Sequence, residues 1–184
     1  MSVTSFEYYY SLNEAAPIEI DQINNLKDDK LFVSVGGGIG TGKTFLTNKF
    51  VELPVIDVDD FVKDVGGGKY DRSNLSKGRK KFNEKISQSL KGDESFIHMG
   101  TNANLNGAKK RLLEAKENGF TTVLVLIDTN PEVAIKQSQY RFEKGERNQI
   151  SEKRIRQSCE DAFKVFESLI KDNKLVDFYV HVKK

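Results

Sequence analysis

The chain has 184 residues, of which 38% are hydrophobic and 30% are charged, and its formal net charge is +2 at pH 7. This length suits one domain with a substantial core, and the near balance of charge argues against strong nonspecific binding to nucleic acid. No apolar run approaches the ~20 residues of a membrane-spanning helix, no secretory leader is visible, and Cys159 is the single cysteine. We therefore expect a cytoplasmic protein without a membrane partner or an intrachain disulfide.

Strands and helices are predicted to alternate from residue 31 onwards. Residues 1–30 show no clear period, which predicts an N-terminal arm with one short helix near 18–27, followed by a domain over 31–184. Strand-like runs lie at 31–35, 54–57, 95–99, 121–127 and 175–182. Helical patterns lie at about 43–52, 59–64, 76–91, 105–118, 131–142 and 151–171. This order predicts an α/β fold with a mostly parallel five-stranded sheet, helices on both faces, and a ligand at the carboxyl ends of the strands.

A glycine-rich segment follows the first predicted strand. Gly37, Gly42, Lys43 and Thr44 match Gly-x-x-x-x-Gly-Lys-Ser/Thr between a strand and a helix, which predicts the P-loop NTPase fold. Backbone N–H groups of such a loop hold a polyphosphate, Lys43 would neutralise the β- and γ-phosphates, and the Thr44 hydroxyl would ligate Mg²⁺. The cofactors expected are ATP and Mg²⁺, with ATP against GTP left open. The predicted nucleotide-binding residues are Gly37, Gly38, Ile39, Gly40, Thr41, Gly42, Lys43, Thr44 and Phe45.

Further glycines in this segment are interpreted as room for the backbone to approach phosphate closely. They are Gly36, Gly38 and Gly40.

Three aspartates follow the second predicted strand, in the stretch Asp57-Val58-Asp59-Asp60-Phe61. We expect the end of this strand to lie next to the glycine loop, so that its carboxylates face the γ-phosphate. Transfer to a hydroxyl needs a carboxylate that accepts the proton of the acceptor, and often a second carboxylate near Mg²⁺. An Asp-x-Asp pair offers both, although one of the three aspartates could instead cap the following helix.

Two basic segments lie later in the chain. The segment 140–148 could form a lid that closes over ATP, excludes water and brings Arg141 and Arg147 to the transferring phosphate. These two are favoured because Arg154 and Arg156, two residues apart in a predicted helix, cannot both face the site. The segment 77–85 could hold an acceptor that already carries phosphate. For both segments the alternative is a solvated charged surface.

The order of these motifs resembles the zeta-toxin-type and polynucleotide-kinase-type group of small P-loop kinases. The resemblance covers about residues 30–160 and implies that Asp59 is the base for the acceptor hydroxyl, which leaves Asp57 on the magnesium side. It also implies that Arg141 and Arg147 are lid arginines. The matching segments are Gly37 to Thr44, Val55 to Phe61, His98 to Thr101, Leu105 to Gly119, Tyr140 to Phe142, and Arg147.

The resemblance implies a choice of acceptors, because zeta toxins phosphorylate UDP-N-acetylglucosamine and polynucleotide kinases phosphorylate 5′-hydroxyl ends. It also allows a protein inhibitor that blocks the ATP site. Zeta-like sequences carry Glu-Gly-Thr after the third strand, whereas this chain has Met99-Gly100-Thr101. The acceptor is therefore not expected to be that of the toxin.

The leading hypothesis is an ATP- and Mg²⁺-dependent kinase that phosphorylates a hydroxyl of a small molecule, a nucleotide sugar or a nucleic-acid end. The alternative is a nucleotide-dependent switch or an ATPase that acts through a protein partner, with Asp128 after the strongest strand as its acidic residue. Thr129 stands where an ATPase motor places a glutamate, and the Asn-Lys-x-Asp segment of GTPases does not occur in the sequence. A nucleotide-binding protein that has lost catalysis is a third class, suggested by Met99.

Overall fold

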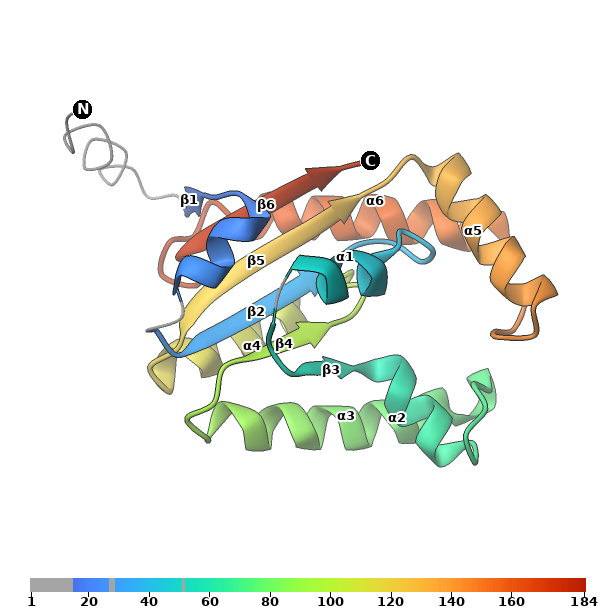
Figure 1. Cartoon of the computed structure of the whole chain (residues 1–184), viewed down its shortest axis with the longest axis horizontal. Helices are drawn as coiled ribbons and strands as arrows, with labels where there is room; N and C mark the ends of the chain where they lie inside the picture. Colours follow the sequence, from blue (N-terminus) through green and yellow to red (C-terminus); the bar gives the residue numbers. More distant parts are fainter. Residues whose placement is uncertain (1–14, 27–28, 51) are drawn as a thin grey trace.

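The structure is a computed structural model that describes residues 15–26, 29–50 and 52–184. Six parallel strands form one sheet in the order β1-β6-β5-β2-β4-β3 (Figure 1). The strands are β1 (Ala16–Pro17), β2 (Leu31–Gly36), β3 (Val55–Asp57), β4 (Phe96–Met99), β5 (Thr121–Asp128) and β6 (Phe178–Lys183). The α-helices are α1 (Lys43–Phe50), α2 (Val58–Val65), α3 (Leu75–Leu90), α4 (Leu105–Glu117), α5 (Pro131–Glu143) and α6 (Glu152–Leu169). The 3₁₀-helices are η3 (Ile20–Leu26) and η4 (Arg72–Asn74).

The central strands are buried on both faces, which explains their continuous apolar sequences. Every residue of β2 is buried, and Phe32 packs with α3, α4 and α6 while Val33 and Val35 pack with α1 and η3. Figure 1 shows α1 and η3 in front of the sheet and α4 and α6 behind it. The predicted parallel sheet with helices on both faces is therefore confirmed. None of the described helices combines the length and apolar character required to cross a membrane.

All five predicted strands are present, and β1 adds a sixth within the predicted N-terminal arm. Ala16 and Pro17 pair in parallel with Phe178 and Tyr179 at the edge of the sheet. The 3₁₀-helix at Ile20–Leu26 buries Ile23, so residues 15–26 pack on the domain. Residues 1–14 of the predicted arm lie outside the described residues.

The strand before the aspartates lies at the edge of the sheet. This strand, β3, is the edge strand, and β4 lies between it and β2, which precedes the glycine loop. The order of parallel strands depends on which crossover each helix makes, and a hydrophobic pattern does not record that choice. Asp57 pairs in register with Met99, and Met99 with Val35, so the aspartates lie two strands from the loop. Because all strands are parallel, their carboxyl ends still share one edge.

Candidate functional site

The loop between β2 and α1 is held in shape by contacts from several elements. Lys43 Nζ donates to the carbonyl oxygens of Gly37 at 2.9 Å and Gly38 at 2.8 Å. The Gly37 N–H donates to the Thr101 carbonyl at 3.3 Å, and the Ile39 N–H donates to Ser158 Oγ at 2.9 Å. These two N–H groups are therefore bound to protein, while the first N–H groups of α1 have no intrahelical acceptor and lie where a helix N-terminus attracts phosphate.

Packing leaves no room for a side chain at positions 38 and 40. A Cβ on Gly38 would overlap with the side chain and backbone of Cys159 on α6, and a Cβ on Gly40 would overlap with the Ala134 carbonyl on α5. Gly40 also has a φ of 80°, which favours glycine. The close approach of two helices therefore gives a second reason for glycine at these positions, and their role as room for phosphate stays a prediction.

The ionisable side chains near the carboxyl ends of the strands are poorly solvated. Burial lowers the pKa of Lys43 to about 8, although the carboxylates of Asp57 and Asp59 act in the opposite direction. Burial raises the pKa of Asp57 to about 6, and the negative charge of Asp59 raises it further. The three groups are close enough to interact electrostatically, although their strands are not adjacent. A cation bound near Asp57 would relieve the repulsion between the carboxylates.

The donor set fits the magnesium ion that a P-loop nucleotide brings. Within the described ranges, His, Cys, Asp and Glu form no group of three that could hold a metal ion. A nucleotide-bound Mg²⁺ needs only one or two protein oxygens, because phosphate and water supply the rest. The Asp57 carboxylate and the exposed Thr44 hydroxyl at the start of α1 are of the required type. Asp57 Oδ1 also accepts from the Asp59 N–H at 3.0 Å and caps α2, so the capping alternative holds for this aspartate.

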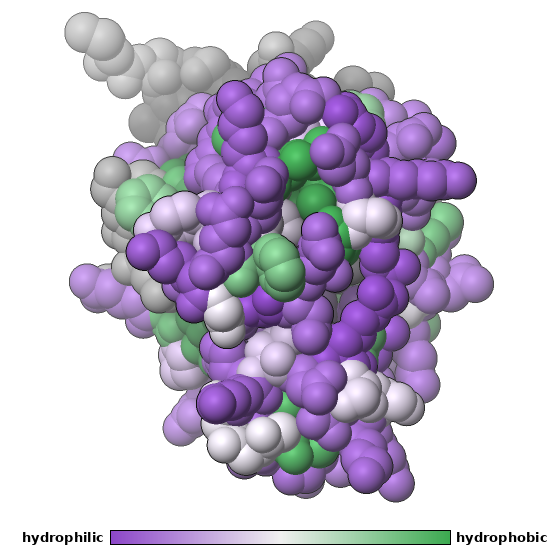
Figure 2. All heavy atoms as spheres, turned by 90° about the vertical axis from the view of Figure 1, so that its right-hand side faces the viewer, coloured by the Kyte–Doolittle hydropathy of each residue, from purple (hydrophilic) through white to green (hydrophobic). Residues whose placement is uncertain are grey.

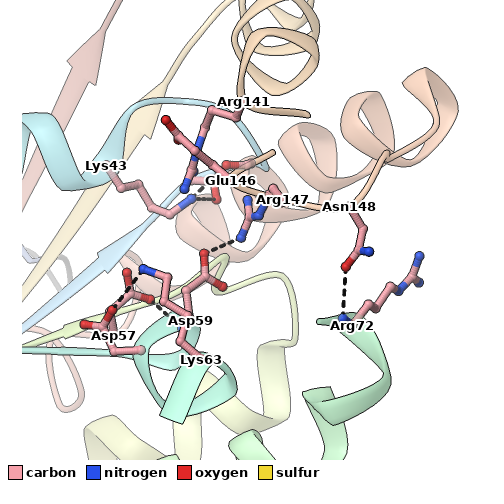
Figure 3. Close-up of polar contacts among 12 residues, drawn as sticks. Lys43, Asp57, Asp59, Lys63, Arg72, Arg141, Glu146, Arg147 and Asn148 are labelled. Carbon is pink, nitrogen blue, oxygen red and sulfur yellow. Dashed lines mark hydrogen bonds and ion pairs between the residues drawn. The ribbon is translucent and has the colours of Figure 1, made fainter. Parts of the chain in front are cut away.

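The segment after α5 docks onto the segment that joins α2 to α3. Arg147 forms an ion pair with Asp59, and its guanidinium lies 4.9 Å from the centre of the Tyr70 ring. The Asn148 side chain accepts a hydrogen bond from the Arg72 N–H at 3.0 Å. Figure 3 shows Arg147 reaching from this segment toward Asp59. The ion pair is largely buried, with 12% of the Arg147 side chain and 22% of the Asp59 side chain exposed.

A cavity of about 690 Å³ opens beside Asp59. Its walls come from the glycine loop at Ile39, from the segment after β4 at Thr101, from η4 and α3, and from the start of α6. Arg147 and Asp59 both line it. The face of the molecule at the carboxyl ends of the strands is mostly hydrophilic (Figure 2). The cavity therefore places a carboxylate, a phosphate-loop residue and several basic side chains around one space.

The structure brings together some predicted site residues and separates others. Lys43, Asp57, Asp59 and Arg147 lie at one locus, whereas Arg141 pairs with Glu146 at 3.3 Å and does not line the cavity. Phe45 is 68% exposed on α1, with Lys184 Nζ 5.8 Å from its ring centre.

Sequence reasoning missed several residues that line the cavity. Arg154 faces the cavity, and Arg156 pairs instead with Glu132 of α5 at 2.6 Å, so these two do diverge as predicted. Their positions could have indicated them, because basic residues occur shortly after the Gly66–Gly68 break and in the first turn of α6. The missed residues are Tyr70, Arg72 and Lys153, whereas Asn148 belongs to the predicted lid segment and Arg154 was placed behind Arg141 and Arg147.

Met99, which replaces the glutamate of zeta-like sequences, points into the core. Its side chain is 2% exposed, and Thr47 Oγ1 donates to its Sδ at 3.9 Å. His98 is also buried, with Nδ1 3.2 Å from Ser34 Oγ, and burial holds its pKa well below the usual value. Neither residue lines the cavity. This strand end therefore contributes to the site through Thr101.

No protein-family model matches the sequence, and no curated protein matches it. Solved structures do match, at low sequence identity. A chain of the Pnkp1/Rnl/Hen1 RNA repair complex has a TM-score of 0.63 at 17% identity, over 77% of this chain and 46% of that one. The AvrRxo1-ORF1:-ORF2 complex with ATP gives 0.62 at 15% identity, over 85% and 56%. Shikimate kinase from Acinetobacter baumannii, in complex with shikimate, gives 0.55 at 13% identity, over 88% of each chain.

These comparisons establish the fold. The chain has the α/β fold of small P-loop kinases, and the resemblance inferred from the motifs is confirmed at that level. The chain spans about half the length of the RNA repair and AvrRxo1 chains that it matches.

Proposed function

We propose that this chain is an ATP- and Mg²⁺-dependent phosphotransferase that moves the γ-phosphate of ATP to a hydroxyl of an acceptor bound in the cavity. The observation that carries this proposal is the position of Asp59, whose carboxylate lines a cavity that is also bordered by the glycine loop. A switch or a motor ATPase has no need of an acceptor-sized space at this place. A kinase needs one, with a carboxylate in its wall.

Each residue of the locus has a role that follows from its chemistry. Lys43 and the N–H groups at the start of α1 bind the β- and γ-phosphates. Thr44 and Asp57 would hold a magnesium ion, which would supply positive charge against the phosphates. Asp59 accepts the proton of the acceptor hydroxyl. Arg147 leaves Asp59 when ligands bind and stabilises the negative charge on the transferring group. Arg141 joins it only if the segment after α5 moves.

The ion pair between Arg147 and Asp59 connects these steps. While the pair is intact, the carboxylate cannot accept a proton from an acceptor and the guanidinium cannot reach a phosphate. A γ-phosphate attracts the guanidinium and so frees the carboxylate at the moment when transfer becomes possible. This exchange makes release of the carboxylate depend on the presence of a γ-phosphate.

The neighbouring structures support a kinase, since one contains ATP and another is shikimate kinase with its acceptor. Asp128, the acidic residue of the ATPase alternative, lies 3.0 Å from His181 Nε2 through its carboxylate. That engagement favours a structural role for Asp128. The buried position of Met99 favours an acceptor other than that of zeta toxins, because the side chain at this position does not reach the cavity.

Incubation with γ-labelled ATP, Mg²⁺ and a panel of acceptors tests the proposal. The panel contains sugars, nucleosides, nucleotides, nucleotide sugars and 5′-hydroxyl oligonucleotides. We expect label to appear on at least one acceptor and to require both Mg²⁺ and the acceptor. Label released only as inorganic phosphate, at a rate that no acceptor changes, would support the switch or ATPase instead.

A further inference from the structure

The side chains around the cavity carry an excess of positive charge. Five of the lining residues are cationic, Arg147 among them, whereas Asp59 and Asp161 are the two acidic ones. Arg147 is paired with Asp59, and Asp161 accepts a hydrogen bond from Gln157 at 2.8 Å. The excess of three positive charges therefore resides on the other four cations, which are Arg72, Arg79, Lys153 and Arg154.

These four cations have no counter-ion among the residues that the structure describes. Across the described ranges, none of them takes part in an ion pair, although neighbouring basic residues do. Arg156, two residues beyond Arg154 on α6, pairs with Glu132, and Lys81, two residues beyond Arg79 on α3, pairs with Asp64 at 2.9 Å. Like charges gathered around one hollow repel one another and create a positive potential in it. An anion bound there removes that cost.

The four side chains approach the cavity from two sides. Arg72 and Arg79 belong to η4 and α3, and Lys153 and Arg154 belong to the first turn of α6. The Arg72 backbone is fixed by its hydrogen bond to Asn148, so the two sides are tied together through the segment after α5. Guanidinium groups bind phosphate oxygens in pairs, and a phosphate dianion has three terminal oxygens to offer to such donors.

We infer that Arg72, Arg79, Lys153 and Arg154 form a subsite for a phosphate group that the acceptor carries in addition to its reacting hydroxyl. This inference rests on the proposed function, because it assigns the two ends of the same cavity to the two ends of one acceptor. The hydroxyl lies toward Asp59, and the phosphate lies between α3 and α6. A volume of about 690 Å³ suits a ligand of nucleotide size and exceeds the needs of a simple sugar.

The basic segment 77–85 supplies a matched control for this assignment. Of its basic residues, Arg79 alone lines the cavity, whereas Lys80 and Lys85 are exposed on α3 and are not among the lining residues. A double Lys80→Gln/Lys85→Gln variant removes two charges close to the cavity without touching it. A double Arg72→Gln/Arg154→Gln variant removes the same number of charges from its walls.

The decisive experiment compares acceptors in free and phosphorylated form, with ATP saturating. Ribose is paired with ribose 5-phosphate, and uridine with its 3′- and 5′-monophosphates. We expect at least one phosphorylated form to have a kcat/KM about tenfold or more above that of its free partner. The Arg72→Gln/Arg154→Gln variant should raise the acceptor KM about tenfold or more for that substrate, with the KM for ATP unchanged as the sign of an intact fold. The lysine variant should behave as wild type.

A 5′-hydroxyl oligonucleotide distinguishes the source of the phosphate. If it surpasses the mononucleotides and loses its advantage in the arginine variant, the subsite binds the phosphate of a nucleic-acid strand. If the mononucleotides surpass it, the ligand is a small phosphorylated molecule. Equal use of free and phosphorylated acceptors, or an arginine variant with an unchanged acceptor KM, would overturn the inference.

A binding measurement separates failure of the subsite from failure of the kinase assignment. If no acceptor is phosphorylated, the proposed function fails, and the subsite is tested by calorimetry with uridine 3′-monophosphate on the Lys43→Met protein, whose phosphate loop is disabled. Binding that disappears in the triple variant with Arg72→Gln and Arg154→Gln supports the subsite. Absence of binding to Lys43→Met, or binding that persists in the triple variant, rejects it.

Discussion

Lys43 and Asp57 are ionisable side chains whose pKa values are both shifted against the charged form, and in both cases burial is the largest cause. In the absence of ligand, each charge therefore weakens the fold. A bound nucleotide with Mg²⁺ would offset both costs, because it supplies the opposite charge to each. The charges that such a site needs for function reduce the stability of the fold. Removing one of them should therefore stabilise the protein while it abolishes activity.

Replacement of Lys43 by methionine should stabilise the protein at pH 7. The pKa of Lys43 is lowered to about 8, so the unfolded chain binds more protons than the folded chain between pH 8 and the ordinary lysine value. The cost of the buried ammonium is fully present below pH 8 and fades as the pH rises toward 10. We expect Lys43→Met to raise the free energy of unfolding by about 1–3 kcal/mol at pH 7, less at pH 10, and to abolish ATP binding.

Urea unfolding at the two pH values measures this effect. The control is Lys80→Met, because Lys80 is exposed on α3 and its charge is already solvated. A Lys43→Met protein that is less stable than wild type at pH 7 would show that the two hydrogen bonds of Lys43 to the loop outweigh its desolvation.

Replacement of Asp57 by asparagine should show the opposite pH dependence. The pKa of Asp57 is raised to about 6, so the folded chain binds more protons than the unfolded chain between about pH 4 and 6. Wild-type stability therefore falls as the pH rises through this window. Asparagine keeps an acceptor for the Asp59 N–H and removes the charge. We expect Asp57→Asn to stabilise by about 1–2 kcal/mol at pH 7 and to have no effect at pH 4.

Thermal unfolding across pH 4 to 8 tests this expectation, with Asp60→Asn as the control because the Asp60 carboxylate is 67% exposed. A gain that is equal at both pH values would mean that the charge of Asp57 is not responsible.

Some residues of the candidate site could be predicted from the sequence, and others could not. Lys43 and Thr44 follow from the P-loop pattern, because that pattern fixes both spacing and local structure. Arg72 and Arg154 could not be found in this way, since their relevance depends on α3 and α6 facing each other across a cavity. The role predicted for Arg141 stays a prediction, because its side chain pairs with Glu146 in this structure.

The glycine loop is fixed by the elements packed against it. α6 touches the loop at Gly38 and α5 touches it at Gly40, so the phosphate site depends on the placement of two helices that follow it by about a hundred residues. Ser158 of α6 adds a hydrogen bond to the Ile39 N–H. The loop is thus shaped by tertiary contacts as much as by its own sequence.

A methyl group at position 38 should disturb this packing. Its Cβ would overlap with Cys159 Sγ and with the α6 backbone, which cannot move aside as a side-chain tip can. We expect Gly38→Ala to cost about 2–4 kcal/mol of stability. The matched control is Gly100→Ala, because a Cβ there meets only the His98 ring at 3.8 Å, an ordinary contact. Denaturant midpoints would measure both, and an equal effect at the two glycines would contradict the assigned packing.

At the level of elements, the sequence predicted the type and order of strands and helices well. The apolar run at β5 and the period of α3 are strong local signals. β1 escaped notice because two residues carry no period, and its pairing with β6 joins parts of the chain that are far apart. The strand order, with β4 between β2 and β3, could not be predicted from local patterns because strand order is a long-range property.

At the scale of the whole molecule, the formal net charge is only +2, although charge is distributed unevenly at the site. Parallel strands place every loop with chemistry at one edge of the sheet, and the helices that follow bring basic side chains around it. The resulting face is hydrophilic and surrounds a cavity with both a carboxylate and free cations (Figure 2). We therefore expect the rate of phosphate transfer to the acceptor to fall as ionic strength rises. This fall should be larger than the part that weaker binding of ATP alone explains.

Asp59 is the centre of this account, because the kinase assignment depends on its carboxylate facing an acceptor. The most direct test compares Asp59→Asn with Asp60→Asn, two adjacent aspartates of which only the first lines the cavity. The measurements are the rate of phosphate transfer to the best acceptor and the Kd for ATP. We expect Asp59→Asn to reduce transfer by about 10²–10⁴-fold with ATP affinity within a few-fold of wild type, and Asp60→Asn to transfer normally. Undiminished transfer by Asp59→Asn would contradict the proposed mechanism.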